Sequence, residues 1–299
     1  MGDTLVVSTG GYGSSLGVIT FDGENVTAAQ FITNKRSAVV TVDDVLYTAV
    51  LAAPMDPDVY KLVDEVNADV QSQLSRVFAK TDVLLNGERD PGNRTEETNL
   101  GDFATDTILW AARQALGDQV QAAVTNGGGI RASIQAGDIT MNDMKTVFPF
   151  GNEVTVLQVT GAELLEALEA ATHAAPEASG AFPQVSEIVF TVDTTVPYEQ
   201  GEQYPDSTYF KPAKPGSRVT IESVGGQPFA LDTLYLIATN DFTAAGGDAY
   251  YAFCYPNATS GYQTGVALED ALVNYIATLL NGTVGEQYAA PQGRITAVK

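Results

Sequence analysis

Three glycines followed by an arginine form the first stretch of the sequence whose residue types are suited to binding a ligand. Asn126 precedes Gly127, Gly128 and Gly129, and Arg131 follows two residues later. Because successive glycines carry no side chains, a ligand can come close to the backbone amides. The guanidinium group of Arg131 is a planar fork of donors that suits phosphate or sugar oxygens. A tight turn with an ordinary surface arginine explains the same residues, since glycine-rich loops are common.

Three other loops carry side chains that complement this one. A second glycine loop contains Phe242 and ends at Asp248, a loop before an apolar helix contains Arg94, and Phe150 stands between a proline and a glycine. Two aromatic rings can sandwich a flat base, with about 1–3 kcal/mol of stacking for each base. A carboxylate accepts hydrogen bonds from sugar hydroxyls, and guanidinium groups bind phosphate. Together these residues match the requirements of a nucleoside phosphate.

Each of these side chains also has an ordinary explanation. Phenylalanine is most often buried in a core, and this holds for Phe150 and Phe242 taken singly. Arg94 is close in sequence to Glu96 and Glu97 and could pair with either carboxylate. The ligand-binding interpretation therefore depends on the set of residues and on whether the fold brings them together.

Composition excludes several classes of function. The chain has 37 acidic and 15 basic residues and a formal net charge of −22, which argues against nucleic-acid binding and against docking to anionic membranes. No apolar run approaches the ~18 residues of a membrane-spanning helix, so membrane insertion is not expected. One cysteine, Cys254, and one histidine, His173, argue against disulfides, cysteine metal clusters, the usual zinc sites and a Ser-His-Asp triad. His173 is predicted to lie at the surface.

The elements that must position these loops are helices and short strands. Residues 56–80 have the helical spacing of apolar residues, with Asp56 as the cap and Pro57 in the first turn. Further helices are predicted at 100–116, 141–146, 161–171 and 267–280, and residues 197–215 are predicted to be a surface loop. Strands are predicted at 4–7, 16–21, 26–32, 38–42, 81–85, 120–124, 153–159, 185–192, 218–224, 234–238 and 294–298.

Four motifs resemble, in order, those of the 5'-nucleotidase family, in its C-terminal substrate-specificity domain. They are residues 94–101 (RTEETNLG), 126–131 (NGGGIR), 148–152 (FPFGN) and 240–248 (NDFTAAGGD). The family includes ecto-5'-nucleotidases, periplasmic UDP-sugar hydrolases and 2',3'-cyclic-nucleotide phosphodiesterases. The resemblance implies an α+β (mixed α/β) fold with mixed sheets and packed helices. It also implies three parts: remnant strands of a metallophosphoesterase domain at 1–52, a linker helix at 53–80, and the specificity domain at 81–299.

The resemblance also implies a role for each motif residue in substrate binding. Phe150 and Phe242 would sandwich the base, while Asp248 and Arg94 would hold the ribose hydroxyls. Arg131 would reach ribose or phosphate oxygens, and Asn126 would face the ribose or the base. The full predicted set of substrate-binding residues is Arg94, Asn126, Gly128, Arg131, Phe150, Phe242 and Asp248.

In this family, hydrolysis is performed by two metal ions and a His-Asp pair in the N-terminal domain. One histidine cannot supply such a site, so we expect no catalytic residue and no cofactor in this chain. The expectation is a fragment that binds a nucleoside, nucleotide or nucleotide-sugar for a missing N-terminal domain. The parent protein is expected to be extracellular, on the cell surface or periplasmic.

Two alternatives remain at this point. The first is a surface-display or adhesion module that keeps the fold without a ligand. The second is an autonomous enzyme that uses the carboxylates of Glu96 and Glu97.

Overall fold

The structure is a computed structural model that describes residues 15–23, 25–33, 38–42, 45–49, 57–255 and 259–298. The chain divides into two compact units, Met1–Ser72 and Gln73–Lys299, which are described separately. The predicted strand at residues 4–7 and the predicted cap Asp56 lie outside the described residues. Within these ranges, no helix is both long and apolar enough to cross a membrane.

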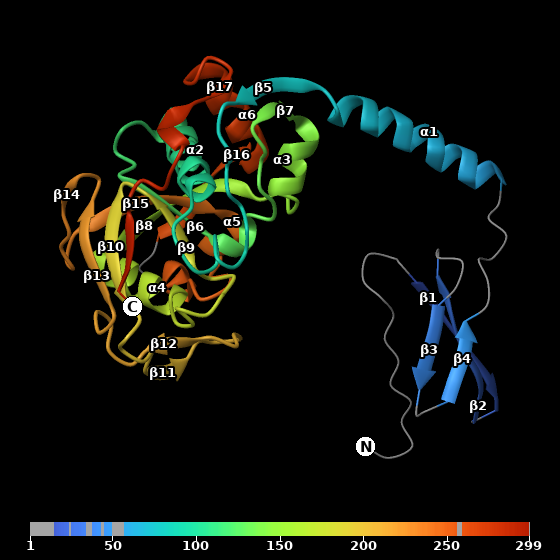
Figure 1. The fold of residues 1–299 in the computed structure, drawn as a ribbon. Coiled ribbons are helices and arrows are strands. Elements are labelled where there is room, and N and C mark those ends of the chain that lie inside the picture. The colour runs from blue at the N-terminus through green and yellow to red at the C-terminus, as the bar shows by residue number, and fades with distance from the viewer. Residues whose placement is uncertain are drawn as a thin grey trace. The chain divides into compact units, whose positions relative to one another are not determined.

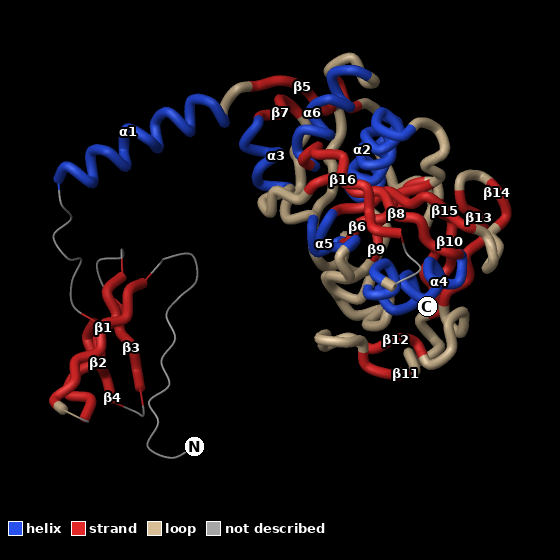
Figure 2. Tube along the Cα trace, turned by 180° about the vertical axis from the view of Figure 1, so that it is seen from behind, coloured by secondary structure: helices blue, strands red, loops and turns tan. Residues whose placement is uncertain are grey.

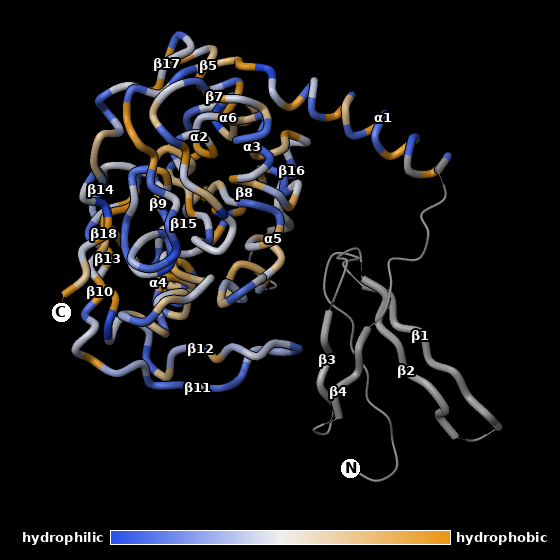
Figure 3. Tube along the Cα trace, turned by 45° about the vertical axis from the view of Figure 1, so that its right-hand side comes forward, coloured by the Kyte–Doolittle hydropathy of each residue, from blue (hydrophilic) through white to orange (hydrophobic). Residues whose placement is uncertain are grey.

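The first unit contains two antiparallel strand pairs. β1 (Ser15–Asp22) pairs with β2 (Asn25–Thr33), and β3 (Ala38–Val42) pairs with β4 (Val45–Ala49) (Figure 1). The strands predicted at 16–21, 26–32 and 38–42 are therefore confirmed. Helix α1 (Pro57–Leu74) follows, and apolar residues recur along it, several of them exposed (Figure 3).

The predicted end of this helix at Lys80 is wrong, because α1 ends at Leu74 and the next residues form strand β5 (Val77–Thr81). In β5 the side chains of Ala79 and Thr81 are buried and Lys80 between them is exposed, which is the alternation of a strand. β5 pairs with β7 (Gly137–Thr140) and with β17 (Thr283–Val284). Pairing with strands far along the chain thus overrides the helical spacing of the local sequence.

A five-stranded sheet forms the centre of the second unit. Its order is β16 (Thr259–Ala267), β8 (Glu153–Thr160), β15 (Leu234–Asn240), β6 (Ala122–Asn126) and β9 (Pro183–Ser186). β15 and β6 run parallel, and the other neighbours run antiparallel. The mixed α/β class expected from the sequence is confirmed.

Both faces of this sheet are buried. In β6, Ala123 belongs to one apolar cluster, while Ala122 and Val124 belong to the other. The first cluster contains α2 (Asn99–Leu116), α3 (Met141–Val147) and α6 (Leu268–Thr278), and the second contains α4 (Gly161–Ala171). The sheet therefore lies between α2 and α4 (Figures 1 and 2). A strand with two buried faces carries apolar residues on both of them, which is why Ala122, Ala123 and Val124 are all apolar.

A second sheet of four strands covers the α4 side. Its order is β14 (Gln227–Pro228), β13 (Val219–Val224), β10 (Ile188–Asp193) and β18 (Ile295–Val298). The single strand predicted at 185–192 is wrong, because the chain leaves the central sheet after β9 and enters this sheet as β10. The change occurs at Glu187, whose φ of 58° places it in the left-handed region.

The segment predicted as a surface loop at 197–215 contains a short hairpin, β11 (Gln200–Gln203) with β12 (Phe210–Pro212). Its neighbour His173 was predicted to lie at the surface, which is wrong. The imidazole ring is half-buried against Tyr198 and Tyr209, with ring centroids 6.0 and 5.5 Å apart, and its Nδ1 lies 2.9 Å from the Ala170 carbonyl oxygen. Burial lowers the pKa of His173.

A buried group of carboxylates ties the last strand to the start of α2. Glu97 accepts the backbone amides of Arg294 (3.0 Å) and Ile295 (2.9 Å), and Asp102 accepts that of Gln292 (3.0 Å). The Arg294 guanidinium group pairs with Asp106 (2.8 Å). Burial raises the pKa of Asp102 to about 8, and the nearby Glu97 carboxylate adds to this effect. The positive charge of Arg294 opposes it.

This raised pKa makes the stability depend on pH in a defined direction. Between about pH 4 and pH 8 the folded chain binds a proton that the unfolded chain has released, so the free energy of unfolding falls as pH rises. Asp102→Asn removes this dependence. We expect the variant to match the wild type near pH 4 and to exceed it by at least about 2 kcal/mol at pH 8.5, since one pKa unit is worth about 1.4 kcal/mol.

Urea denaturation of the whole chain at several pH values measures this difference. The exposed Asp118→Asn is the matched control and should change stability by about the same small amount at every pH. A less stable Asp102→Asn variant at pH 8.5 would contradict the prediction.

Candidate functional site

The two glycine loops meet because the strands before them are parallel neighbours. β6 ends at Asn126 and turns into the 3-10 helix η1 (Gly127–Gly129), and β15 ends at Asn240 and turns into helix α5 (Asp241–Ala244). Carboxyl ends of adjacent parallel strands lie at the same sheet edge, where ligands commonly bind. The Asn240 amide joins the loops, because its Nδ2 donates to Thr125 Oγ1 (2.9 Å) and Asn126 Oδ1 (3.1 Å).

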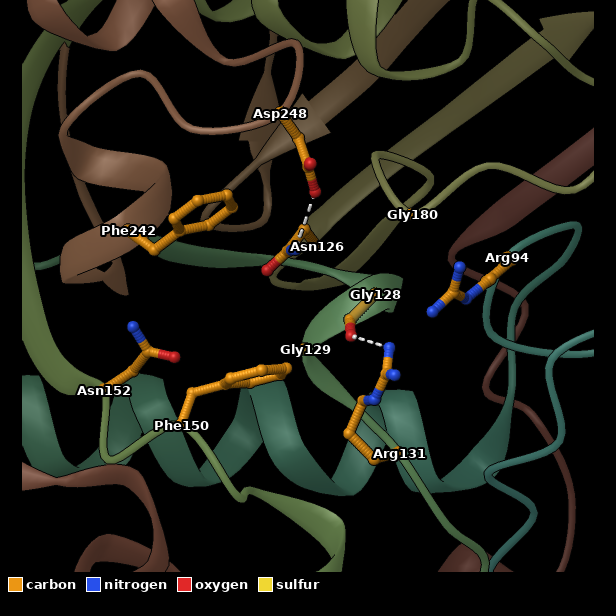
Figure 4. A pocket seen from close by; sticks show the side chains of 10 residues that line it. All are labelled: Arg94, Asn126, Gly128, Gly129, Arg131, Phe150, Asn152, Gly180, Phe242 and Asp248. Carbon is orange, nitrogen blue, oxygen red and sulfur yellow. Dashed lines mark hydrogen bonds between the residues drawn. The ribbon is translucent and has the colours of Figure 1, made fainter. Parts of the chain in front are cut away.

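A cavity of about 300 Å³ opens at this edge (Figure 4). All seven residues predicted from the sequence line it, together with Gly129 from the same glycine turn and with Asn152 and Gly180, which the sequence analysis did not select. The lining residues are Arg94, Asn126, Gly128, Gly129, Arg131, Phe150, Asn152, Gly180, Phe242 and Asp248. The structure thus brings the predicted set together, while the assigned binding roles stay predictions.

One side of the cavity is aromatic. Phe150 and Phe242 are 61% and 44% exposed, so neither is a core residue. The Phe242 ring lies on the bare backbone of Gly247, where a Cβ would come within 2.6 Å of the ring atoms. The guanidinium carbon of Arg131 lies 5.6 Å from the centre of the Phe150 ring, which is a cation–π contact. Exposed rings held in place in this way can receive a flat ligand.

The carboxylate of Asp248 is held on the opposite side. Asp248 adopts a left-handed backbone with φ of 52°, a strained conformation for a residue with a side chain. Its Oδ2 accepts a 2.8 Å hydrogen bond from Asn126 Nδ2. Burial, followed by the nearby charge of Asp248, raises the pKa of Tyr209. The neutral amide of Asn126 therefore orients this carboxylate.

The third side of the cavity is cationic. Burial lowers the pKa of Arg94, with further lowering by the charges of Arg89 and Arg131. The Nε of Arg94 is buried and has no hydrogen-bond partner among the described residues. Arg131 Nη1 donates to the Gly128 carbonyl oxygen at 3.2 Å. A group of arginines in a chain of net charge −22 favours an anionic ligand.

Three residues near the cavity were missed in the sequence. Asn152 lies at the end of the FPFGN motif, so its position carried a signal; its Nδ2 donates to Asp241 Oδ1 at 2.6 Å. Gly180 lies in an ordinary loop and Tyr209 in a segment predicted as a loop, and neither had a signal. The suggested partnership of Arg94 with Glu97 is not formed, because Glu97 accepts the amides of the last strand.

The carboxylates proposed for an autonomous enzyme do not line this cavity, since neither Glu96 nor Glu97 is among its lining residues. Within the described ranges, no three side chains of His, Cys, Asp or Glu gather so that they could hold a metal ion. These residues therefore do not fit a two-metal centre, and no step of hydrolysis is assigned to them.

Comparison with known proteins gives consistent matches. The family model described as 5'-nucleotidase, C-terminal domain matches residues 77–254. The trifunctional nucleotide phosphoesterase protein YfkN of Bacillus subtilis is 35% identical over 257 residues, covering 84% of this chain and 16% of that protein. The 5'-nucleotidase of Vibrio cholerae is 32% identical over 228 residues, covering 75% of this chain and 34% of that protein.

A solved structure gives the same result for the fold. The crystal structure of a 5'-nucleotidase precursor from Thermus thermophilus aligns with a TM-score of 0.66 and 29% identity, covering 96% of this chain and 50% of that chain. This chain therefore spans half or less of the length of each of these relatives.

Proposed function

This chain belongs to the 5'-nucleotidase C-terminal domain family, and on that basis we propose that its cavity binds the nucleoside part of a nucleotide substrate. One observation carries the proposal: two exposed phenylalanines from separate loops line a single cavity with an aspartate and two arginines. An exposed aromatic pair has no folding role that would explain its position, whereas a base stacked on the rings would cover both.

The base would lie between Phe150 and Phe242. Their exposed fractions, 61% and 44%, leave apolar surface that a flat heterocycle can bury. Stacking does not depend on the identity of the base, because every base has a π face. Both purine and pyrimidine nucleosides are therefore candidate ligands. Asn152 is placed to contact a base edge. Its side-chain Nδ2 donates to Asp241, and its side-chain oxygen points into the cavity (Figure 4).

The sugar and the phosphate would lie towards the polar side of the cavity. The Asp248 carboxylate, oriented by Asn126, is an acceptor for ribose hydroxyls. Arg94 and Arg131 supply donors for hydroxyl or phosphate oxygens. Gly128 lets the ligand approach the backbone of the glycine turn.

Hydrolysis would be performed by a metallophosphoesterase domain that is separate from residues 81–299. The two divalent metal ions belong to that domain in this proposal, β1 to β4 would be its last strands, and α1 (Pro57–Leu74) would be part of the linker that follows. The parent protein would be a nucleotide-degrading hydrolase that acts in the periplasm, at the cell surface or outside the cell.

A thermal-shift experiment on the whole chain tests binding. At a ligand concentration 100 times the Kd, a single site stabilises the fold by about 2.7 kcal/mol. For a unit of this size, that corresponds to a rise in Tm of roughly 5–10 °C. Adenosine, AMP, uridine and UDP-glucose are the ligands to compare. Ribose 5-phosphate, which has no base, is the control.

Each alternative predicts a different result, the first in the thermal-shift experiment and the second in a phosphate-release assay. A surface-display or adhesion module would show no shift with any of the four ligands at millimolar concentration. An autonomous enzyme would release phosphate from AMP when Mn²⁺ or Zn²⁺ is added to this chain, whereas the proposed binding domain would bind AMP and release none.

A further inference from the structure

The glycines around the cavity differ in whether the fold leaves room for a side chain. A Cβ at Gly128 would lie 2.9 Å from the Gly180 carbonyl oxygen, and a Cβ at Gly129 would lie 3.1 Å from Asn126 Oδ1. Both approaches are tighter than ordinary van der Waals contact, so the fold itself requires a small residue at these two positions. Gly180 is different, because a Cβ there would meet nothing closer than 3.7 Å.

The backbone of Gly180 does not require glycine either. Gly180 is not among the glycines with positive φ, so an L-residue can adopt its conformation. Its position is nevertheless fixed: its carbonyl oxygen accepts the Gly128 amide at 2.8 Å, and the preceding Ser179 amide donates to the Arg94 carbonyl oxygen at 3.0 Å. An alanine at 180 would therefore fold in the same place and add one methyl group to the cavity wall.

Two of the charged groups of the site lie next to that methyl position, together with the Cα of Gly128. A Cβ at Gly180 would lie 3.7 Å from Asp248 Oδ2 and 3.8 Å from Arg94 Nη1. Figure 4 shows Gly180 between these two side chains. A ligand group that satisfies both must donate a hydrogen bond to the carboxylate and accept one from the guanidinium group. Two adjacent hydroxyls do this, one for each partner.

We propose that Gly180 is a specificity-determining residue for the sugar, because its bare backbone keeps open the space through which a vicinal diol reaches Asp248 and Arg94. This inference rests on the proposed function and adds to it a residue that touches neither the base nor the phosphate. A methyl group at this position occupies the space of the diol and leaves the aromatic side of the cavity unchanged. The site then loses its preference for ribose over sugars without the two hydroxyls.

Calorimetric titration of Gly180→Ala with adenosine and with 2',3'-dideoxyadenosine tests the proposal in the whole chain. We expect the Kd for adenosine to rise at least 10-fold relative to the wild type, and the Kd for dideoxyadenosine to change less than 2-fold. A general structural defect would raise both values by the same factor. Gly285→Ala is the matched control, because its added Cβ would meet only the end of the flexible Gln287 side chain, and it should change neither Kd.

The outcomes separate this inference from the proposed function. Wild-type binding of adenosine together with an unchanged adenosine Kd in Gly180→Ala would overturn the role of Gly180 alone. An equal loss for both ligands would also overturn it. A wild-type chain that binds neither nucleoside would overturn the proposed function, and the role of Gly180 with it.

Discussion

Replacing Phe242 with alanine is expected to weaken adenosine binding by about 5- to 150-fold, because stacking on an aromatic side chain contributes about 1–3 kcal/mol. The Phe242 ring is 44% exposed and rests on Gly247, so its removal leaves no buried cavity in the core. The free energy of unfolding should therefore change far less than the binding free energy. Calorimetric titration with adenosine gives the Kd, and urea denaturation gives the stability of the same variant.

Two further variants make this experiment specific to stacking. Phe242→Tyr keeps an aromatic ring and should bind within a few-fold of the wild type. Leu231→Ala removes an apolar side chain that is 51% exposed and does not line the cavity, and its Kd should equal that of the wild type. The stacking role of Phe242 would be disproved if Phe242→Ala bound adenosine as tightly as Leu231→Ala.

Phe150, the second ring of the aromatic side, tests the same idea. Its ring is more exposed, at 61%, and it also contacts the Arg131 guanidinium group at 5.6 Å. Removing the ring therefore also releases Arg131 from a cation–π contact. Because the two rings would grip one base, the losses in Phe150→Ala and Phe242→Ala should not add in the double variant, as contacting groups are coupled.

The residues of the cavity could be selected from the sequence because loops carry them. Phe150 lies between a proline and a glycine, and Phe242 precedes a glycine pair, so neither was in the apolar repeat of a helix or strand. Residues outside such repeats are the ones left to contact ligands. Asn126 ends strand β6 and Asp248 lies in the loop after β15, and their approach depends on those strands being parallel neighbours. The family resemblance implied that these residues share a site, but neither it nor the local spacing predicted which strands pair.

The parts that were missed depend on contacts between distant segments. Val77 fits the helical spacing of α1, yet it lies in β5 because strands from residues 137–140 and 283–284 pair there. Glu97 lies in the same motif as Arg94, yet it accepts hydrogen bonds from the backbone amides of Arg294 and Ile295. Gly180 has no motif around it, and only its position between Asp248 and Arg94 reveals it. Local propensity does not encode such pairings.

A second large effect is expected for Arg218, which holds the chain segment that leads into the cavity. Arg218 is only 3% exposed, and its guanidinium group donates to the carbonyl oxygens of Thr172 (3.1 Å) and Ala175 (2.8 Å), just after α4. The fully buried Glu169 carboxylate accepts the Arg218 amide at 3.2 Å and the Ser217 hydroxyl at 2.6 Å. Burial lowers the pKa of Arg218, and the neighbouring Glu169 charge opposes that effect.

Arg218→Ala should therefore destabilise the second unit by about 3–5 kcal/mol, since it leaves two buried carbonyl groups without donors and removes the positive charge that attracts the buried Glu169 carboxylate. Arg218→Lys should recover only part of this loss, because one ammonium group cannot reach carbonyls that a planar fork spans. Urea denaturation at pH 7 measures both variants. Arg76→Ala, at an exposed position, is the control and should stay within about 0.5 kcal/mol of the wild type.

The same variant links stability to the site. The segment after α4 supplies the carbonyl oxygens of Gly180 and Phe182, which accept the amides of Gly128 (2.8 Å) and Gly127 (2.7 Å). If Arg218 anchors this segment, Arg218→Ala should also weaken adenosine binding in the fraction that stays folded, whereas Arg76→Ala should not. A loss of stability below about 1 kcal/mol would mean that water or neighbouring donors replace the guanidinium group, and the anchoring role would be rejected.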